Sequence, residues 1–97
     1  MPKHNNELQD SVIQRIKKLR NERDISQLAL SNILNISSGQ IGNIESPRFR
    51  HKYTLKQIYT FCKYINFPFE QIFLSEDEIT APNSKDLLIK KIIEYDE

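Results

Sequence analysis

The chain has 97 residues, 14 lysines and arginines against 13 aspartates and glutamates, and a formal net charge of +1. This length fits one compact domain and excludes barrel enzymes and doubly wound nucleotide-binding folds. With 38% hydrophobic and 28% charged residues, no apolar run long enough for a membrane span and no signal-peptide core at the start, we expect a globular, cytoplasmic protein that does not bind membranes.

The pattern of the first residues predicts a helix over residues 10–21. Apolar side chains recur there at helical spacing, and Asp10 or Ser11 can accept the free N–H groups at the start. Only two glycines occur in the chain, Gly39 and Gly42, and the apolar–polar alternation typical of strands is scarce. The fold is therefore predicted to be all-α.

Two short helices are expected next, joined by a tight turn. Ser26 is expected to cap a helix over residues 27–34, which ends at Asn35 because asparagine tolerates left-handed backbone geometry. Ser37 is expected to cap the next helix, over residues 38–45, through a capping box with the glutamine three residues later. The proline that follows disfavours further helix.

The rest of the chain is expected to hold three more helices. Thr54 is predicted to cap a helix that ends near residue 65, and a short helix follows over residues 69–73. Residues 75–83 are interpreted as an acidic linker, after which Ser84 is expected to cap a last helix. That helix carries an apolar stripe made of Leu88, Ile89, Ile92 and Ile93.

Charge is distributed very unevenly along the chain. Residues 11–65 carry ten basic side chains against three acidic ones, whereas residues 66–97 carry three basic side chains against eight acidic ones. The low net charge is thus a cancellation between a basic portion and an acidic one. Such asymmetry indicates a portion that faces a polyanion, followed by an acidic tail.

Metal binding and catalysis are not expected. The single Cys62 and the scattered His4 and His51 provide too few ligands for a zinc site and no internal disulfide. Neither paired carboxylates nor a phosphate-binding loop occurs. Cys62, the one plausible nucleophile, falls on an apolar helix face, where an inert core role is favoured over redox sensing. We therefore expect no cofactor, no metal and no enzymatic activity.

Two short helices joined by a tight turn and followed by basic residues form the helix-turn-helix plan of DNA-binding proteins. At 100° per residue, Ile41 and Ile44 mark the buried side of the second helix of this pair. The opposite side offers glycine, serine, asparagine and glutamine, whose amides can bond to adenine edges in the major groove. Phosphate affinity is expected from the basic loop after this helix and from helix N-termini.

Residues 12–73 resemble the DNA-binding domain of phage repressors and Cro proteins, the xenobiotic-response-element-like helix-turn-helix family. The resemblance is carried by Ile16-Lys17-Lys18-Leu19-Arg20, Ile25-Ser26-Gln27, Leu30-Ser31, Leu34-Asn35-Ile36-Ser37, Ile41, Ile44-Glu45 and Phe69-Glu70-Gln71-Ile72-Phe73. It implies a compact five-helix, lambda-repressor-like domain over residues 10–74, which follows a flexible start at 1–9 and precedes the linker and additional C-terminal helix at 75–97. Such domains bind operator DNA, usually as dimers.

The resemblance also implies roles for individual residues. The base-facing positions are Ser38, Gly39, Gln40 and Asn43. The phosphate-facing positions are Gln27, Ser37, Arg48, Arg50 and Lys52, although the last three are also consistent with an ordinary solvated loop. Arg20 and Glu45 look like the family's internal ion pair, with two unrelated surface charges as the alternative. Phe49 and Tyr53 either anchor the loop or contact the DNA backbone, and His51 is expected to be exposed.

Some positions depart from the family pattern. Asn35 replaces the usual turn glycine, and Ser31 replaces a small alanine. Gly39 and Gly42 remove side chains where relatives read bases, which favours close backbone approach or recognition of DNA shape. Ala29 and Ile33 are apolar where relatives usually carry charge. These two residues and the C-terminal stripe are predicted either to cover one another or to form a homodimer contact, with packing of the last helix on its own domain as the alternative.

The sequence therefore predicts a regulator, a repressor, that binds double-stranded DNA as a homodimer without catalysis. The alternative is an antitoxin-like or adaptor protein that uses the same fold mainly to bind another protein, with the C-terminal segment as the possible contact.

Overall fold

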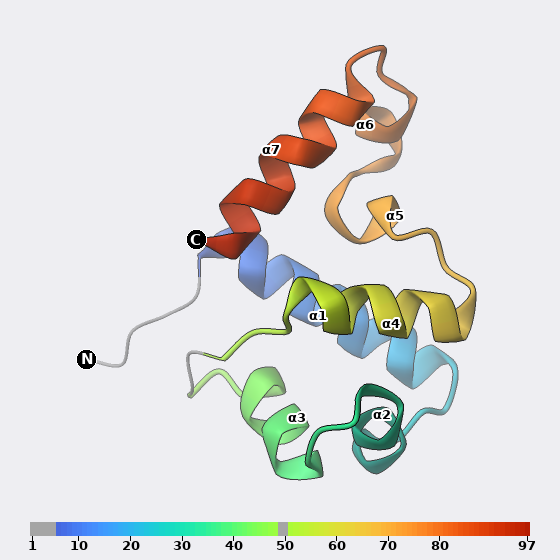
Figure 1. Cartoon of the computed structure of the whole chain (residues 1–97), viewed down its shortest axis with the longest axis vertical. Helices are drawn as coiled ribbons and strands as arrows, with labels where there is room; N and C mark the ends of the chain where they lie inside the picture. The colour runs from blue at the N-terminus through green and yellow to red at the C-terminus, as the bar shows by residue number, and fades with distance from the viewer. Residues whose placement is uncertain (1–5, 49–50) are drawn as a thin grey trace.

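The structure is a computed structural model that describes residues 6–48 and 51–97. The described residues form helices and no strand: α1 (Glu7–Glu22), α2 (Gln27–Leu34), α3 (Ser38–Glu45), α4 (Leu55–Ile65), α5 (Glu70–Phe73), α6 (Glu76–Thr80) and α7 (Ser84–Asp96). In Figure 1, α2 and α3 lie at one end of the molecule and α6 and α7 at the other, with α1 and α4 between them. The all-α prediction is confirmed.

A single hydrophobic core joins these elements. Its buried members include Val12, Ile13, Ile16, Leu30, Leu34, Ile41, Ile44, Tyr53, Ile58, Phe61, Cys62, Ile72, Phe73 and Tyr95. The two largest fully buried side chains are those of Tyr53, in the connection between α3 and α4, and of Tyr95, near the end of α7. The C-terminal helix therefore shares the core of the helix-turn-helix portion.

Helix α1 begins earlier than expected. Asn6, rather than Asp10 or Ser11, is its N-cap: Asn6 Oδ1 accepts from the Gln9 backbone N–H at 2.8 Å, and Gln9 Oε1 accepts from the Asn6 N–H at 2.9 Å. This capping box adds a helical turn before the apolar periodicity starts. The expected flexible start at 1–9 is thus wrong from residue 6 onward, and residues 1–5 lie outside the described residues.

The expected acidic linker contains helix α6. Ser75 Oγ accepts from the Glu78 N–H at 3.2 Å, and Glu78 Oε1 accepts from the Ser75 N–H at 2.9 Å, which completes another capping box. The bond that the Ser75 N–H donates to the carboxylate also holds the pKa of the Glu78 carboxyl below its ordinary value. Ser84, expected to be a cap, is instead the first residue of α7; Asn83 precedes it and makes no side-chain capping bond.

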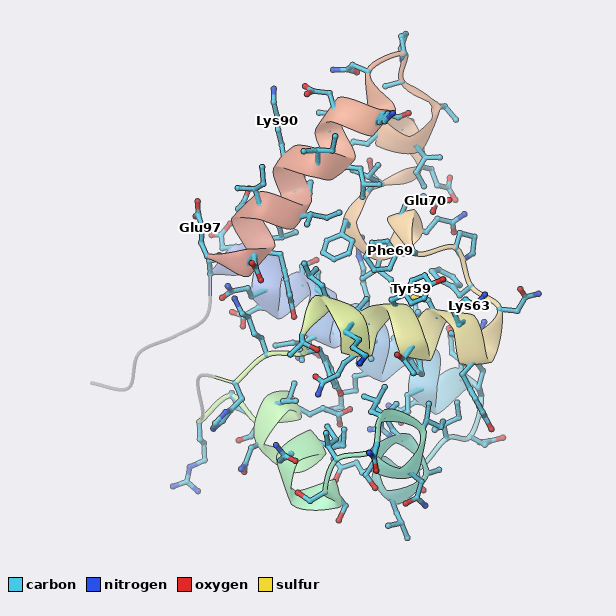
Figure 2. All side chains as sticks on the ribbon, viewed as in Figure 1. Tyr59, Lys63, Phe69, Glu70, Lys90 and Glu97 are labelled. Atoms are coloured by element: carbon cyan, nitrogen blue, oxygen red, sulfur yellow. The ribbon has the colours of Figure 1, made fainter. Side chains whose placement is uncertain are left out.

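Helix α7 packs on α1, α5 and α6. The prediction that the C-terminal stripe covers Ala29 and Ile33 is therefore wrong, and Figure 1 has α2 and α7 at opposite ends of the molecule. Leu88 and Ile92 pack against the core, whereas Ile89 and Ile93 are 48% and 58% exposed. Figure 2 shows Lys90 on α7 and Glu97, the residue after this helix, pointing away from the rest of the molecule. Within the described residues, no helix combines the length and apolarity needed to cross a bilayer.

Candidate nucleic-acid interface

The turn between α2 and α3 has the geometry expected from its sequence. Ser26 Oγ accepts from the Ala29 N–H at 2.9 Å at the start of α2. Asn35 ends α2 in the left-handed conformation, with φ 58° and ψ 45°. Ser31 of α2 is buried, and its hydroxyl donates to the Leu28 carbonyl at 2.6 Å.

Helix α3 turns one side toward the core and one side outward. Ile41 and Ile44 are buried, as predicted. Opposite them lies the outer face of α3, which we define as Ser38, Gly39, Gln40 and Asn43; the first three are exposed and Asn43 is half-buried. These residues carry no charge, so this face offers only hydroxyl, amide and backbone groups to a ligand.

The capping box of α3 engages one of the predicted base-facing side chains. Ser37 Oγ accepts from the Gln40 backbone N–H at 3.1 Å, and Gln40 Oε1 accepts from the Ser37 N–H at 3.1 Å. A bidentate contact to adenine requires both the oxygen and the nitrogen of the Gln40 amide. Such a contact would therefore require Gln40 Oε1 to leave Ser37, whereas the Asn43 side chain makes no such capping bond within the described residues.

The glycines of α3 are not required by the fold. Neither has a positive φ. A Cβ at Gly39 would have Ser37 Oγ as its nearest neighbour, at 3.8 Å, and a Cβ at Gly42 would have Gln27 Oε1 at 3.7 Å. Both distances are ordinary van der Waals contacts, so alanine fits at either position. Without a side chain at these positions, the α3 backbone can come closer to a ligand.

A buried ion pair fixes α3 to α1. Arg20 Nε donates to Glu45 Oε2 at 2.9 Å and Arg20 Nη2 donates to Glu45 Oε1 at 2.8 Å. Arg20 Nη1 also donates to the Ile25 carbonyl at 2.8 Å, and Gln27 Nε2 donates to Glu45 Oε1 at 3.1 Å. The expected pairing of Arg20 with Glu45 is thus present, and Gln27 extends it to α2. Three helices are held together behind the outer face of α3.

The predicted phosphate-facing residues lie in different structural settings. Gln27 is the first residue of α2 and Ser37 is the N-cap of α3, so both lie at helix N-termini. Arg48 is exposed, with its backbone N–H donating to Ser46 Oγ at 3.2 Å. Arg50, like Phe49, lies outside the described residues. Lys52 is half-buried, and its Nζ donates to the Tyr95 carbonyl at 2.8 Å, which engages one of its three donors.

A hollow of about 190 Å³ lies beside the outer face of α3. Gln40 and Asn43 line it from α3, while His51, Lys52 and Thr54 line it from the connection to α4. The sequence predicted phosphate contacts for Arg48, Arg50 and Lys52 of this connection. The structure brings its last residues next to two of the predicted base-facing side chains.

Two tyrosines are buried: Tyr53, which was expected either to anchor its loop or to contact the DNA backbone, and Tyr95, for which the sequence suggested no role. Tyr53 is 1% exposed, which settles its position as a core anchor, and its hydroxyl has no hydrogen-bond partner within the described part of the chain. Tyr95 is fully buried, and its hydroxyl donates to the Tyr53 carbonyl at 2.6 Å. The helical spacing of Leu88, Ile92 and Tyr95 was the available signal for the second tyrosine.

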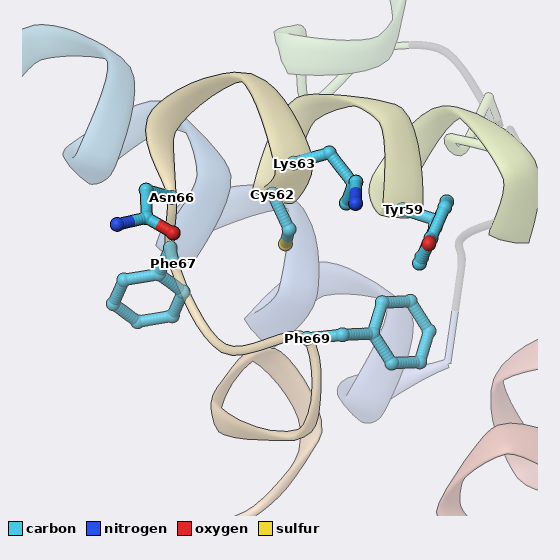
Figure 3. Close-up of a pocket in the computed structure, with 6 residues that line it drawn as sticks. All are labelled: Tyr59, Cys62, Lys63, Asn66, Phe67 and Phe69. Atoms are coloured by element: carbon cyan, nitrogen blue, oxygen red, sulfur yellow. The ribbon is translucent and has the colours of Figure 1, made fainter.

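Cys62 is buried on α4, as expected for a core residue. Figure 3 shows it beside Phe67 and Phe69 in a hollow of about 160 Å³. Burial raises the pKa of its thiol to about 11, so the thiol is protonated and weakly nucleophilic at neutral pH. Among the described residues, no group of three or more His, Cys, Asp or Glu side chains could hold a metal ion.

Comparison with known protein families matches residues 13–78 to a helix-turn-helix domain family. Comparison with curated proteins and with solved structures finds no match. A domain of this type indicates a DNA-binding regulator and is typically non-enzymatic. Because the matched segment covers more than half of the 97 residues, the chain belongs to the helix-turn-helix domain family.

Proposed function

We propose that the protein is a sequence-specific transcriptional regulator, a repressor of the phage repressor and Cro type, that inserts α3 into the major groove of double-stranded DNA. It acts in the cytoplasm, without catalysis. The observation that carries the proposal is the uncharged outer face of α3, held from behind by the buried pairing of Arg20, Glu45 and Gln27. Preorganised polar groups on a rigid helix are what base recognition requires.

Affinity and specificity come from different residues in this proposal. Asn43 contacts base edges, and so does Gln40 once its amide oxygen leaves the capping box. Arg48, Arg50 and Lys52 supply phosphate contacts, together with Gln27 and Ser37 at the helix N-termini. The glycines of α3 let its backbone approach the groove closely.

The test begins with selection of bound sequences from a random duplex pool. Binding of the selected duplex and of a mixed-sequence duplex is then measured at several salt concentrations. Asn43→Ala is expected to weaken binding of the selected duplex more than that of the mixed one. Arg48→Ala is expected to weaken both and to lower the salt slope by about one unit.

Lys90→Ala serves as the matched control for Arg48→Ala. It removes one positive charge from an exposed position on α7, at the end of the molecule remote from α3, and should change neither affinity. Absence of binding to any duplex at low salt would contradict the DNA-binding proposal. An equal loss of both affinities in Asn43→Ala would contradict its role in base recognition.

We further propose that the protein binds as a homodimer whose two α3 helices read half-sites about 34 Å apart. The exposed Ile89 and Ile93 on α7 support a contact between copies, because they lie one turn apart and are not covered by the rest of the described chain. Sedimentation equilibrium of the full chain and of an Ile89→Asp, Ile93→Asp variant tests this. A parent chain that is already monomeric at all concentrations would contradict the homodimer.

The same exposed isoleucines favour one alternative function. In an antitoxin-like or adaptor protein, the C-terminal segment would bind a different protein, and the helix-turn-helix would serve mainly as a scaffold. A full chain that stays monomeric and shows no salt-dependent binding to mixed-sequence duplex would favour this alternative over the regulator.

A further inference from the structure

The last turn of α7 is held from three directions through Tyr95. The Tyr95 carbonyl accepts from Gln9 Nε2 and from Lys52 Nζ, both at 2.8 Å. Its hydroxyl donates to the Tyr53 carbonyl at 2.6 Å, and its ring meets the Phe73 ring edge-on at a centroid distance of 5.6 Å. Carbonyls at a helix C-terminus usually depend on water or capping groups. Here two side chains from distant parts of the sequence serve that purpose.

Two consecutive residues of the connection between α3 and α4 depend on these contacts. Lys52 binds the Tyr95 carbonyl and lies with its Nζ 5.3 Å from the centre of the Tyr95 ring, while Tyr53 accepts from the Tyr95 hydroxyl. Tyr95 therefore fixes both the side chain of Lys52 and the backbone of Tyr53. Because these two bonds tie Lys52 and Tyr53 to α7, removing one of them should loosen this attachment.

The fixed segment forms part of the candidate DNA interface. Lys52 lines the hollow whose other wall includes Gln40 and Asn43. The position of Lys52 relative to the outer face of α3 thus depends on a tyrosine that does not itself line that hollow.

Tyr53 provides a second connection between Tyr95 and α3. Its ring is buried in the same hydrophobic core as Ile41 and Ile44 of α3. The carbonyl of the same residue accepts from the Tyr95 hydroxyl.

We propose that Tyr95 is a positioning residue for DNA binding. By holding Lys52 and the Tyr53 carbonyl, it keeps these two residues in the place where Lys52 and the outer face of α3 meet the same stretch of DNA. The inference rests on the proposed function, since it concerns how well a preformed surface fits a duplex. A segment already ordered in the free protein loses less conformational entropy on binding.

Tyr95→Phe tests the proposal because it removes only the hydroxyl and keeps the buried ring. Tyr64→Phe is the matched control: it makes the same chemical change at a side chain that is 65% exposed on α4. Affinity for the selected duplex is measured at 10 °C, where circular dichroism verifies that each full-length variant is folded. Tyr95→Phe is expected to bind about fivefold more weakly than the parent chain, because energetically coupled positions away from a ligand typically change affinity by this order. Tyr64→Phe should bind like the parent.

Backbone amide NMR spectra of the free proteins provide a readout that does not depend on DNA. Tyr95→Phe should shift the amide resonances of Lys52, Asn43 and Glu45, and Tyr64→Phe should leave them in place. A folded Tyr95→Phe chain with parental affinity and unshifted α3 resonances would overturn the positioning role while the DNA-binding proposal stands. If the parent chain binds no duplex at all, the proposed function fails instead, and the spectra still decide whether Tyr95 positions the α3–α4 connection.

Discussion

At the scale of single residues, the ion pair between Arg20 and Glu45 is expected to affect stability strongly because it is both bidentate and buried. Removing one partner leaves the other charge buried without compensation, so Glu45→Ala should lower the free energy of unfolding by about 3–5 kcal/mol. The ion pair between Lys90 and Asp86 is a natural control, since both of its side chains are more than half exposed. Asp86→Ala should cost no more than about 0.5 kcal/mol. Urea denaturation measures both values, and equal losses would show that burial of the first pair has no special effect.

Three buried acidic groups make the protein sensitive to alkaline pH. Burial raises the pKa of Cys62 from an ordinary value of 9.0 to about 11, and it raises the pKa of Tyr53 and of Tyr95 well above the ordinary value of 10.0. Unfolding lets these groups ionise at their ordinary values. Their contribution to stability is therefore complete below about pH 9 and is lost as pH rises further. The free energy of unfolding from urea titrations should be lower at pH 10.5 than at pH 8, and Tyr95→Phe should reduce this difference. A free energy of unfolding that is the same at pH 8 and pH 10.5 would contradict the raised pKa values.

At the scale of the elements, the sequence predicted α2, the turn and α3 well because local signals decide them. Ser26 and Ser37 cap their helices, and Asn35 takes the left-handed turn position. The start of α1 and the whole of α6 differ from the prediction although both carry capping boxes, because apolar side chains are too sparse in these two stretches to show a helical period. The hydrogen bonds of Tyr95 that hold the end of α7 in place involve residues more than 40 positions away in the sequence. No local pattern carries that information.

The glycines of α3 are expected to lower the stability of the fold while allowing the α3 backbone to come close to DNA. Glycine within a helix costs about 0.5–1 kcal/mol relative to alanine, and a Cβ at Gly39 meets only ordinary contacts. Gly39→Ala should therefore raise the free energy of unfolding by about that amount. If the α3 backbone lies against the groove, the same change should weaken binding of the selected duplex. Melting curves and duplex titrations on one preparation measure both effects, and a variant that is more stable and binds equally well would rule out close approach at Gly39.

At the scale of the whole molecule, a cluster of acidic side chains lies at the end opposite the helix-turn-helix pair. The helix-turn-helix pair is at one end, and the acidic first turn of α6 is at the other. Simple deletion of residues 75–97 would not isolate the effect of the acidic charge, because it would also remove Tyr95 from the core. Neutralising exposed acidic side chains one pair at a time keeps the fold and changes only the charge.

The acidic end should influence DNA binding only at low salt. Charges separated by more than the Debye length, about 8 Å at 0.15 M and about 30 Å at 0.01 M, are largely screened from one another. A variant with Glu76→Gln and Asp77→Asn should thus match the parent in affinity for mixed-sequence duplex at 0.15 M salt and bind more tightly at 0.01 M. The matched variant, Glu22→Gln with Asp24→Asn, makes the same change in net charge next to the start of α2 and should bind more tightly at both salt concentrations. Equal gains for the two variants at 0.15 M would mean that net charge, rather than its distribution, governs non-specific binding.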